Sequence, residues 1–120
     1  MSGLMIGDIA VQRIIEEEVP FFIPHETFVE ATPEALAPHR HWLEPNAMDP
    51  ETGMLILPFQ SYLVRTKHHT ILIDTCIGCG KSITHRPQWF QRTDQTWLNN
   101  LRAAGLQPEA IDYVFCTHLH

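Results

Sequence analysis

A helical segment between two apolar runs constrains the fold of this chain more than any other feature. Residues 93–104 place apolar side chains on one face at helical spacing, and Gly105 follows as a stop signal. Residues 70–74 before this segment and residues 112–117 after it are short apolar runs typical of strands. The order of strand, helix and strand predicts an α/β (α+β) fold, in which chemistry gathers at the carboxyl ends of strands.

The predicted helix has recognisable ends. The hydroxyl of Thr93 can cap its first turn, and Asp94 complements the positive end of the helix dipole. Gly105 fits a left-handed C-cap, and Leu106 can fold back on Leu101 as in a Schellman motif. The apolar stripe, which is expected to face the core, consists of Trp97, Leu98, Leu101 and Ala104.

An antiparallel hairpin is predicted upstream of the helix. Residues 55–57 and 62–64 are strand material, and a polar turn at residues 67–69 leads from them into the first of the two apolar runs. Two such runs joined by a short polar turn are typical of a hairpin. The segment 71–73 is continuously apolar and is expected to be covered on both faces, and the strand over residues 112–117 is expected to be buried.

The amino-terminal part is less regular. Residues 6–15 alternate enough to predict one strand with a bulge, which the acidic residues 16–18 would end on the surface. Prolines bracket residues 19–24, which favours a loop or an edge segment. Thr32, followed by a proline, predicts the start of a short helix, and residues 46–53 are expected to form a turn-rich surface excursion.

Length and composition exclude several classes of protein. At 120 residues the chain is expected to belong to one domain. A net charge of -6 with only 8 lysines and arginines argues against nucleic acid as a partner. No apolar run approaches the ~20 residues that a bilayer span needs, so no membrane is expected. An odd number of cysteines, 3, and the lack of a secretory signal at the amino terminus favour a reducing cytoplasm.

The chain ends in Thr117-His118-Leu119-His120, directly after the second apolar strand. Side chains at positions i and i+2 of an extended backbone point the same way, so the two imidazoles can converge on one cation. Zinc in hydrolases is bound by neutral imidazole nitrogens of this kind. The spacing therefore favours His118 and His120 as metal ligands.

Two other histidine pairs show that such spacing alone is weak evidence. His39-x-His41 lies between prolines with no strand leading into it, and His68-His69 lies in the predicted hairpin turn. Neither pair is expected to supply primary metal ligands.

The cysteines give no zinc or redox signature. Cys76 and Cys79 form a CxxC sequence, but the second pair that a zinc ribbon needs is missing. The neighbouring Gly78 and Gly80 instead favour a loop beneath the cleft of the predicted metal site. Cys116 lies in an apolar strand and is expected to be a small core residue.

Asp74 at the end of one strand and Thr117-His118-Leu119-His120 at the end of the other resemble the metallo-β-lactamase-like hydrolases. The signature of that family is His-x-His-x-Asp-His after a buried strand, with an upstream strand that ends in aspartate. The resemblance covers roughly the second half of the chain. It implies that residues 1–120 are the truncated amino-terminal part of a single αββα sandwich domain, ending inside the signature.

The resemblance also implies a chemistry. His118 and His120 would bind one or two zinc ions, with iron or manganese as alternatives, and Asp74 would orient the ligand loop by hydrogen bonding without binding metal itself. The activity implied is hydrolysis of a small-molecule ester, lactone, thioester or related bond by metal-bound hydroxide. The early segment, rich in proline and aromatic residues, is similar to the lactonase and organophosphate-hydrolase relatives. The 120-residue chain itself is expected to be inactive and to contain no further catalytic residue.

Other functions stay open at this point. The chain could be a non-catalytic metal-binding or interaction module, or an iron-dependent oxidoreductase on the same fold. A barrel amidohydrolase also places His-x-His after a strand, but the upstream hairpin that ends in Asp74 favours the first family. Half a domain would leave residues 71–73 and 114–115 uncovered, which predicts marginal stability and self-association.

Overall fold

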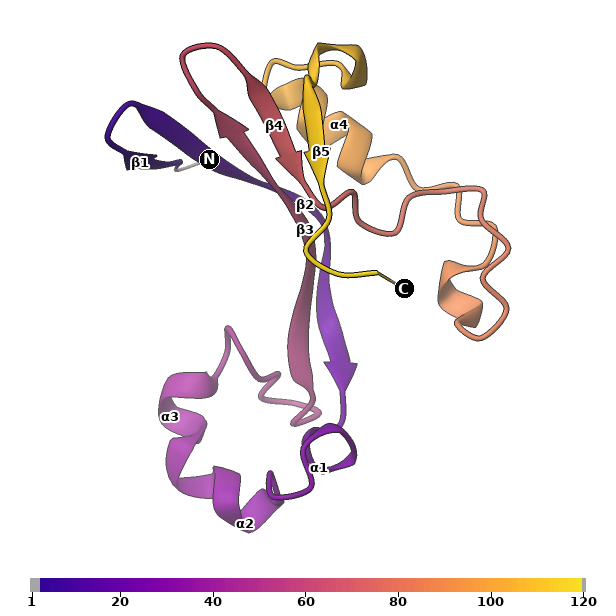
Figure 1. Cartoon of the computed structure of the whole chain (residues 1–120). Helices are drawn as coiled ribbons and strands as arrows, with labels where there is room; N and C mark the ends of the chain where they lie inside the picture. The colour runs from indigo at the N-terminus through magenta and orange to yellow at the C-terminus, as the bar shows by residue number, and fades with distance from the viewer. Residues whose placement is uncertain (1–2, 120) are drawn as a thin grey trace. The chain divides into compact units, whose positions relative to one another are not determined.

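The computed structural model describes residues 3–119, whose strands form one five-stranded mixed sheet in the order β1-β2-β3-β4-β5 (Figure 1). Short helices connect the strands, and the sequence-based expectation of a mixed α/β fold is confirmed. The elements are β1 (Leu4–Ile6), β2 (Ile9–Phe22), α1 (Pro24–Thr27), α2 (Pro33–Leu36), η1 (Ala37–His39), α3 (Arg40–Leu43), β3 (Leu55–Arg65), β4 (Thr70–Ile73), η2 (Pro87–Trp89), α4 (Thr96–Ala103), η3 (Pro108–Ala110) and β5 (Tyr113–Phe115).

The chain divides into two compact units. The sheet unit comprises Met1–Glu17 and Phe59–His120, and the excursion unit comprises Glu18–Pro58. Within residues 3–119, no helix combines the length and the apolar character needed to cross a bilayer.

The amino terminus forms a hairpin, so the prediction of one bulged strand over residues 6–15 is wrong. β1 pairs antiparallel with β2, with Leu4 opposite Val11 and Ile6 opposite Ile9. The turn between them is Gly7-Asp8, and Gly7 adopts a φ of 60°, which glycine tolerates without strain. The Gly-Asp pair is the signal that distinguishes this hairpin from a bulge.

β2 continues through the acidic run to Phe22, so the predicted surface ending at residues 16–18 is also wrong. The side chain of Glu16 is only 6% exposed. Pro20 lies inside the strand, where a loop or edge segment was expected. β1 pairs with β2 only over residues 9–11, so Pro20 does not need to donate a hydrogen bond to β1. Proline is tolerated in a strand at such an unpaired edge position, because it has no backbone N–H to donate.

The excursion unit contains the predicted short helix. The Thr32 hydroxyl accepts a hydrogen bond from the Ala35 amide at 3.2 Å, which confirms the N-cap of α2. The turn-rich segment 46–53 is not purely a surface excursion, because Met48 is buried and forms a β-bridge with Leu55.

The predicted hairpin of β3 and β4 is confirmed. Tyr62 lies opposite Ile73 and Arg65 opposite Thr70 in an antiparallel ladder. In the turn, the Thr66 hydroxyl accepts hydrogen bonds from the amides of His68 and His69, at 3.2 and 2.9 Å. A threonine side chain thus supplies the turn geometry that glycine or asparagine usually provides.

β5 pairs parallel with β4 and is exposed, which corrects the expectation of a buried strand. Figure 1 shows the two strands side by side. In the ladder, Ile71 lies opposite Tyr113 and Ile73 lies opposite Phe115. The exposed fractions of Tyr113, Val114 and Phe115 lie between 56% and 60%, because β5 is the last strand of the sheet. Cys116, predicted as a core residue, is exposed as well.

The core of the sheet unit joins three strands to the helix α4. Ile14, Leu63, Leu72 and Leu101 are each at most 1% exposed and pack as one cluster. Trp97, Ala104 and Leu106 pack against this cluster, so three members of the predicted apolar stripe, Trp97, Leu101 and Ala104, face the core. Burial of such side chains is the main driving force for this packing.

The predicted C-terminal end of α4 is confirmed, whereas the predicted N-terminal cap is not. The N-cap of α4 is Gln95, which makes no side-chain capping hydrogen bond, so the predicted Thr93 cap is wrong; the Asp94 carboxylate accepts from the Thr96 amide at 2.8 Å. The C-terminal end is the expected Schellman motif. The Leu106 amide donates to the Leu101 carbonyl at 3.2 Å, and Gly105 has a φ of 82°.

Candidate functional site

The site begins where two parallel strands end at the same edge of the sheet. β4 ends at Ile73 and β5 at Phe115, so Asp74 and Thr117 follow neighbouring strand ends. The Asp74 amide donates to the Phe115 carbonyl at 2.8 Å. Asp74 adopts a φ of 59°, a left-handed conformation that aspartate tolerates better than most residues. The backbone therefore turns sharply at the position of the predicted aspartate.

The Asp74 carboxylate holds Thr117 through both of its oxygens. The Thr117 amide donates to Oδ1 at 2.8 Å, and the Thr117 hydroxyl donates to Oδ2 at 2.6 Å. These contacts, the hydroxyl first and the amide second, lower the pKa of Asp74 below its usual range. The carboxylate is therefore ionised at neutral pH and acts as an acceptor in both bonds.

The direction of these bonds determines the tautomer of His118. The Thr117 hydroxyl lies 2.8 Å from Nδ1 of His118. A hydroxyl has one proton, and here Asp74 takes it, so the hydroxyl oxygen accepts from His118. Nδ1 must then carry the proton, and the lone pair of the neutral ring is on Nε2. A relay from Asp74 through Thr117 to His118 thus assigns the donor role to Nδ1 and the acceptor role to Nε2 of the neutral ring.

His120, the second predicted ligand, lies outside the described residues. Among residues 3–119, no three histidine, cysteine, aspartate or glutamate side chains gather closely enough to hold a metal ion. The structure therefore brings Asp74 and His118 together, and the role of His120 remains a prediction from its spacing.

The other histidine pairs contact residues away from Asp74, and His69 lies beside Asp112 and Tyr113. In the excursion unit, His41 lies 3.0 Å from the Pro38 carbonyl through Nδ1, and the Trp42 indole donates to Nδ1 of His39 at 3.4 Å. His68 and His69 lie in the turn that precedes β4, at the opposite end of that strand from Asp74.

The CxxC segment forms a loop directly after Asp74. The Cys76 thiol lies 3.4 Å from the Ser61 hydroxyl, and burial raises its pKa to about 11. Cys79 is exposed, and its sulfur accepts a hydrogen bond from the side-chain amide of Gln95 at 3.4 Å. The three cysteines are free thiols.

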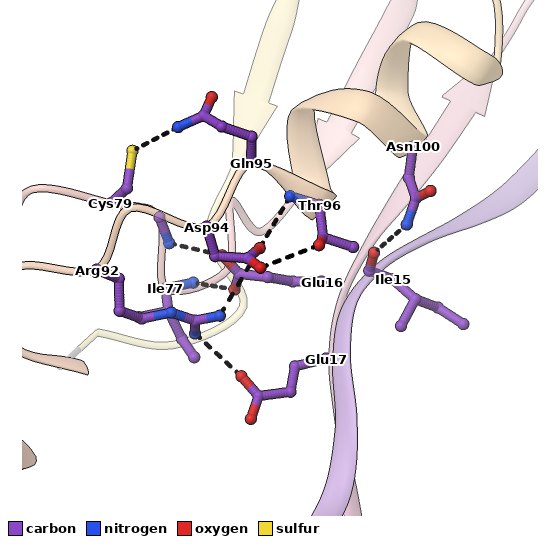
Figure 2. Close-up of polar contacts among 11 residues, drawn as sticks. Ile15, Glu16, Glu17, Ile77, Cys79, Arg92, Asp94, Gln95, Thr96 and Asn100 are labelled. Atoms are coloured by element: carbon purple, nitrogen blue, oxygen red, sulfur yellow. Dashed lines mark hydrogen bonds and ion pairs between the residues drawn. The ribbon is translucent and has the colours of Figure 1, made fainter. Parts of the chain in front are cut away.

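Two contacts of this region were not anticipated from the sequence. Glu16 of β2 accepts hydrogen bonds from the amides of Ile77 and Gly78, and Arg92 forms an ion pair with Glu17 (Figure 2). Alternation along β2 carries the signal for the first contact, because Glu16 follows the buried Ile14 at strand spacing. The alternation in β2 does not indicate that the amides of Ile77 and Gly78 are the partners of Glu16.

A family comparison assigns the fold. The model of the metallo-beta-lactamase superfamily matches residues 58–120, which is more than half of the chain. This chain belongs to the metallo-β-lactamase superfamily. The matched residues contain β4, the Asp74 turn, α4 and β5, and the expected family is therefore confirmed. The search of curated proteins found no match.

Solved structures agree with the family at the level of the fold. A probable metal-dependent hydrolase from Staphylococcus aureus superposes with a TM-score of 0.69 at 24% identity, over 98% of this chain and 40% of that chain. AidC, a dizinc quorum-quenching lactonase in complex with a product, gives 0.66 at 20% identity, over 99% and 36%. The hydrolase AbOPH, of the beta lactamase superfamily, gives 0.63 at 24% identity, over 98% and 35%. The chain thus spans two fifths or less of the length of these structures.

The tautomer of His118 is directly testable. We expect neutral His118 to carry its proton on Nδ1, because the Thr117 hydroxyl accepts there, whereas Thr117→Val should restore the usual mixture of tautomers. Imidazole nitrogen shifts in a ¹⁵N NMR spectrum report this directly. His41, which contacts a carbonyl through Nδ1, and His39, which accepts at Nδ1, give the two reference signatures. An Nε2-protonated His118 in the unmodified chain would contradict the relay.

Cysteine reactivity gives a second test. With a pKa of about 11, only about one Cys76 thiol in a thousand is ionised at pH 8, and the side chain is partly buried. Iodoacetamide should therefore modify the exposed Cys79 and Cys116 well before Cys76. Peptide mapping by mass spectrometry measures the order, and urea-unfolded chain is the control in which all three should react alike. Early modification of Cys76 in the folded chain would refute the burial argument.

Proposed function

We propose that this chain supplies the first ligands of a metal-dependent hydrolase, with His118 and His120 as ligands and Asp74 as the group that orients them. The observation that carries the proposal is the relay from Asp74 through Thr117 to His118. Such a relay fixes the tautomer and the orientation of a metal-binding imidazole, as carboxylate partners do in zinc enzymes.

The residues present fit a divalent metal. Zinc is bound by neutral imidazole nitrogens, and the His118 tautomer puts the ring lone pair on Nε2. Both Asp74 oxygens already accept from Thr117, which suits an orienting group better than a ligand. A bound metal would lower the pKa of water enough to supply a hydrolytic nucleophile at neutral pH. We propose one or two zinc ions, with iron or manganese as alternatives that the same ligand types accept.

The substrate class is proposed from the family and the fold. A small molecule with an ester, lactone, thioester or related bond suits a metal-dependent hydrolase, and one of the similar structures is a lactonase. The loops that select among these substrates differ between members of one fold, so the reaction follows from the site and not from the fold.

Zinc content tests the proposal in the polypeptide obtained by reading the gene beyond His120. Replacing His118 and His120 by alanine should abolish hydrolysis and remove bound zinc, because two imidazole ligands are lost. Asp74→Asn should weaken zinc binding about 10–100-fold, since the hydroxyl of Thr117 loses its charged acceptor. Metal analysis after dialysis and competition with a chelator measure both effects.

The matched control replaces His39 and His41 by alanine. These residues have the same His-x-His spacing, but they lie in short helices of the excursion unit and contact Pro38 and Trp42. Zinc content and turnover should stay as in the unmodified protein. Equal loss of zinc from both double variants, or no loss from either, would refute the proposed ligands.

We also propose that the 120-residue chain associates with itself through β5. This edge strand presents Tyr113, Val114 and Phe115 to solvent, and an exposed apolar edge can pair with another chain. Sedimentation velocity should show a concentration-dependent increase in mass that Val114→Lys reduces. Val29→Lys, at an exposed valine of the excursion unit, should have no effect. A monomer at every concentration would contradict this role of β5.

A further inference from the structure

A buried carboxylate from β2 holds the loop that follows Asp74. Glu16 is 6% exposed and uses both of its oxygens in this contact. The Ile77 amide donates to Oε2 at 2.8 Å, and the Gly78 amide donates to Oε1 at 3.0 Å. The two donors are consecutive in the chain and lie 61 and 62 positions from their acceptor, so this contact ties the first long strand to the loop.

The loop backbone is shaped to receive an anion. Cys76 and Gly78 both have positive φ values, 59° and 72°, on either side of Ile77. Alternation of this kind turns successive amides toward a common point and creates a small anion-binding concavity. The Glu16 carboxylate occupies that point, so the chain supplies the anion itself.

The far end of the same loop is also held. The Gly80 amide donates to the Arg92 carbonyl at 2.8 Å. The Arg92 guanidinium pairs with Glu17 at 3.1 Å (Figure 2). Neighbouring glutamates of β2 therefore act on different parts. Glu16 binds the loop backbone, whereas Glu17 binds a side chain on the segment beside the loop.

We propose that Glu16 is a positioning residue for the candidate metal site: its carboxylate fixes the loop from Asp74 to Gly78, and through Asp74 it fixes Thr117 and His118. The part of this proposal that concerns metal rests on the proposed function, whereas the coupling between Glu16 and Thr117 does not.

The chemistry of the contact explains why the effect reaches Asp74. Two residues, Thr75 and Cys76, separate Asp74 from Ile77, and the thiol of Cys76 contacts the Ser61 hydroxyl at 3.4 Å. Loss of the carboxylate would leave two inward-facing amides without their acceptor, which a folded loop avoids by rearranging. The left-handed turn at Asp74 is the nearest point at which such a rearrangement would change the direction of its carboxylate.

Hydrogen exchange in the unmodified 120-residue chain provides the first test. If Glu16 couples the loop to the site, the amides of Ile77, Gly78 and Thr117 should exchange through one shared opening with the same dependence on denaturant. The amide of Leu72 in β4 provides the reference for global unfolding, since Leu72 is buried and paired with Leu63. Independent opening of Thr117 overturns the proposal without any substitution.

A pair of matched variants provides the second test. Glu16→Gln replaces one acceptor oxygen by a donor, and it should lower the protection of Ile77, Gly78 and Thr117 by about tenfold or more. Glu17→Gln removes the same charge from the next position and should leave these three amides within about twofold of the unmodified chain. Unchanged Leu72 protection shows that each variant is folded. Equal effects of the two variants, or loss confined to Ile77 and Gly78, overturn the proposal.

Zinc affinity separates this inference from the proposed function. In a polypeptide that extends beyond His120, Glu16→Gln should weaken zinc binding about tenfold relative to Glu17→Gln. Substitution of a residue that orients metal ligands commonly has an effect of this size. If the exchange coupling is present but neither unmodified protein nor variant binds zinc, the proposed function fails and the coupling of Glu16 to Thr117 stands. If zinc binds and the coupling is absent, Glu16 is not a positioning residue.

Discussion

The contact between the Asp74 carboxylate and Thr117 is the interaction on which the candidate site depends. An ionised carboxylate can only accept hydrogen bonds, so it determines where the single proton of the Thr117 hydroxyl points. That direction passes to His118 and decides which ring nitrogen carries the lone pair. Through three polar groups, the negative charge of Asp74 therefore decides which nitrogen of the neutral His118 ring carries the proton.

Backbone geometry makes this contact possible. Parallel pairing of β4 with β5 brings two strand ends to one edge of the sheet, and the left-handed turn at Asp74 directs its carboxylate across that edge. Glu16 and the positive φ of Gly78 then fix the loop beyond the turn. The loop that shapes the candidate site is thus fixed by its own contacts, apart from the buried cluster of α4 and three strands.

The sequence predicted the parts of the fold that follow from short-range patterns. The hairpin of β3 and β4, the Schellman end of α4 and the capping Thr32 all depend on a few neighbouring residues, and the structure confirms them. The turn at Gly7-Asp8 is hidden within the predicted strand over residues 6–15, because alternation continues on both sides of it. The burial of β5 was misjudged because apolar composition does not say whether a strand lies at the edge of its sheet.

The candidate site was predictable to the same extent. Asp74 and His118 could be singled out from their positions after strands, and the resemblance to the family gave them their expected roles. Thr117 as the connecting hydroxyl and Glu16 as the loop anchor could not be found, because each depends on a partner distant in sequence. Contacts of that kind are decided by register and loop conformation, which a pattern of residue types does not contain.

The parallel pairing of β4 and β5 has a consequence for how such a protein can diversify. Only the two strand ends define the carboxylate–hydroxyl–imidazole arrangement, and the long connection between them carries α4 and η2. Insertions at exposed bends of that connection, away from α4 and from the loop that Glu16 holds, would change which molecules can reach this edge of the sheet. The arrangement of Asp74, Thr117 and His118 would stay the same. Evolution can therefore change what approaches this edge and the hydrogen-bonded arrangement of Asp74, Thr117 and His118 as two separate traits.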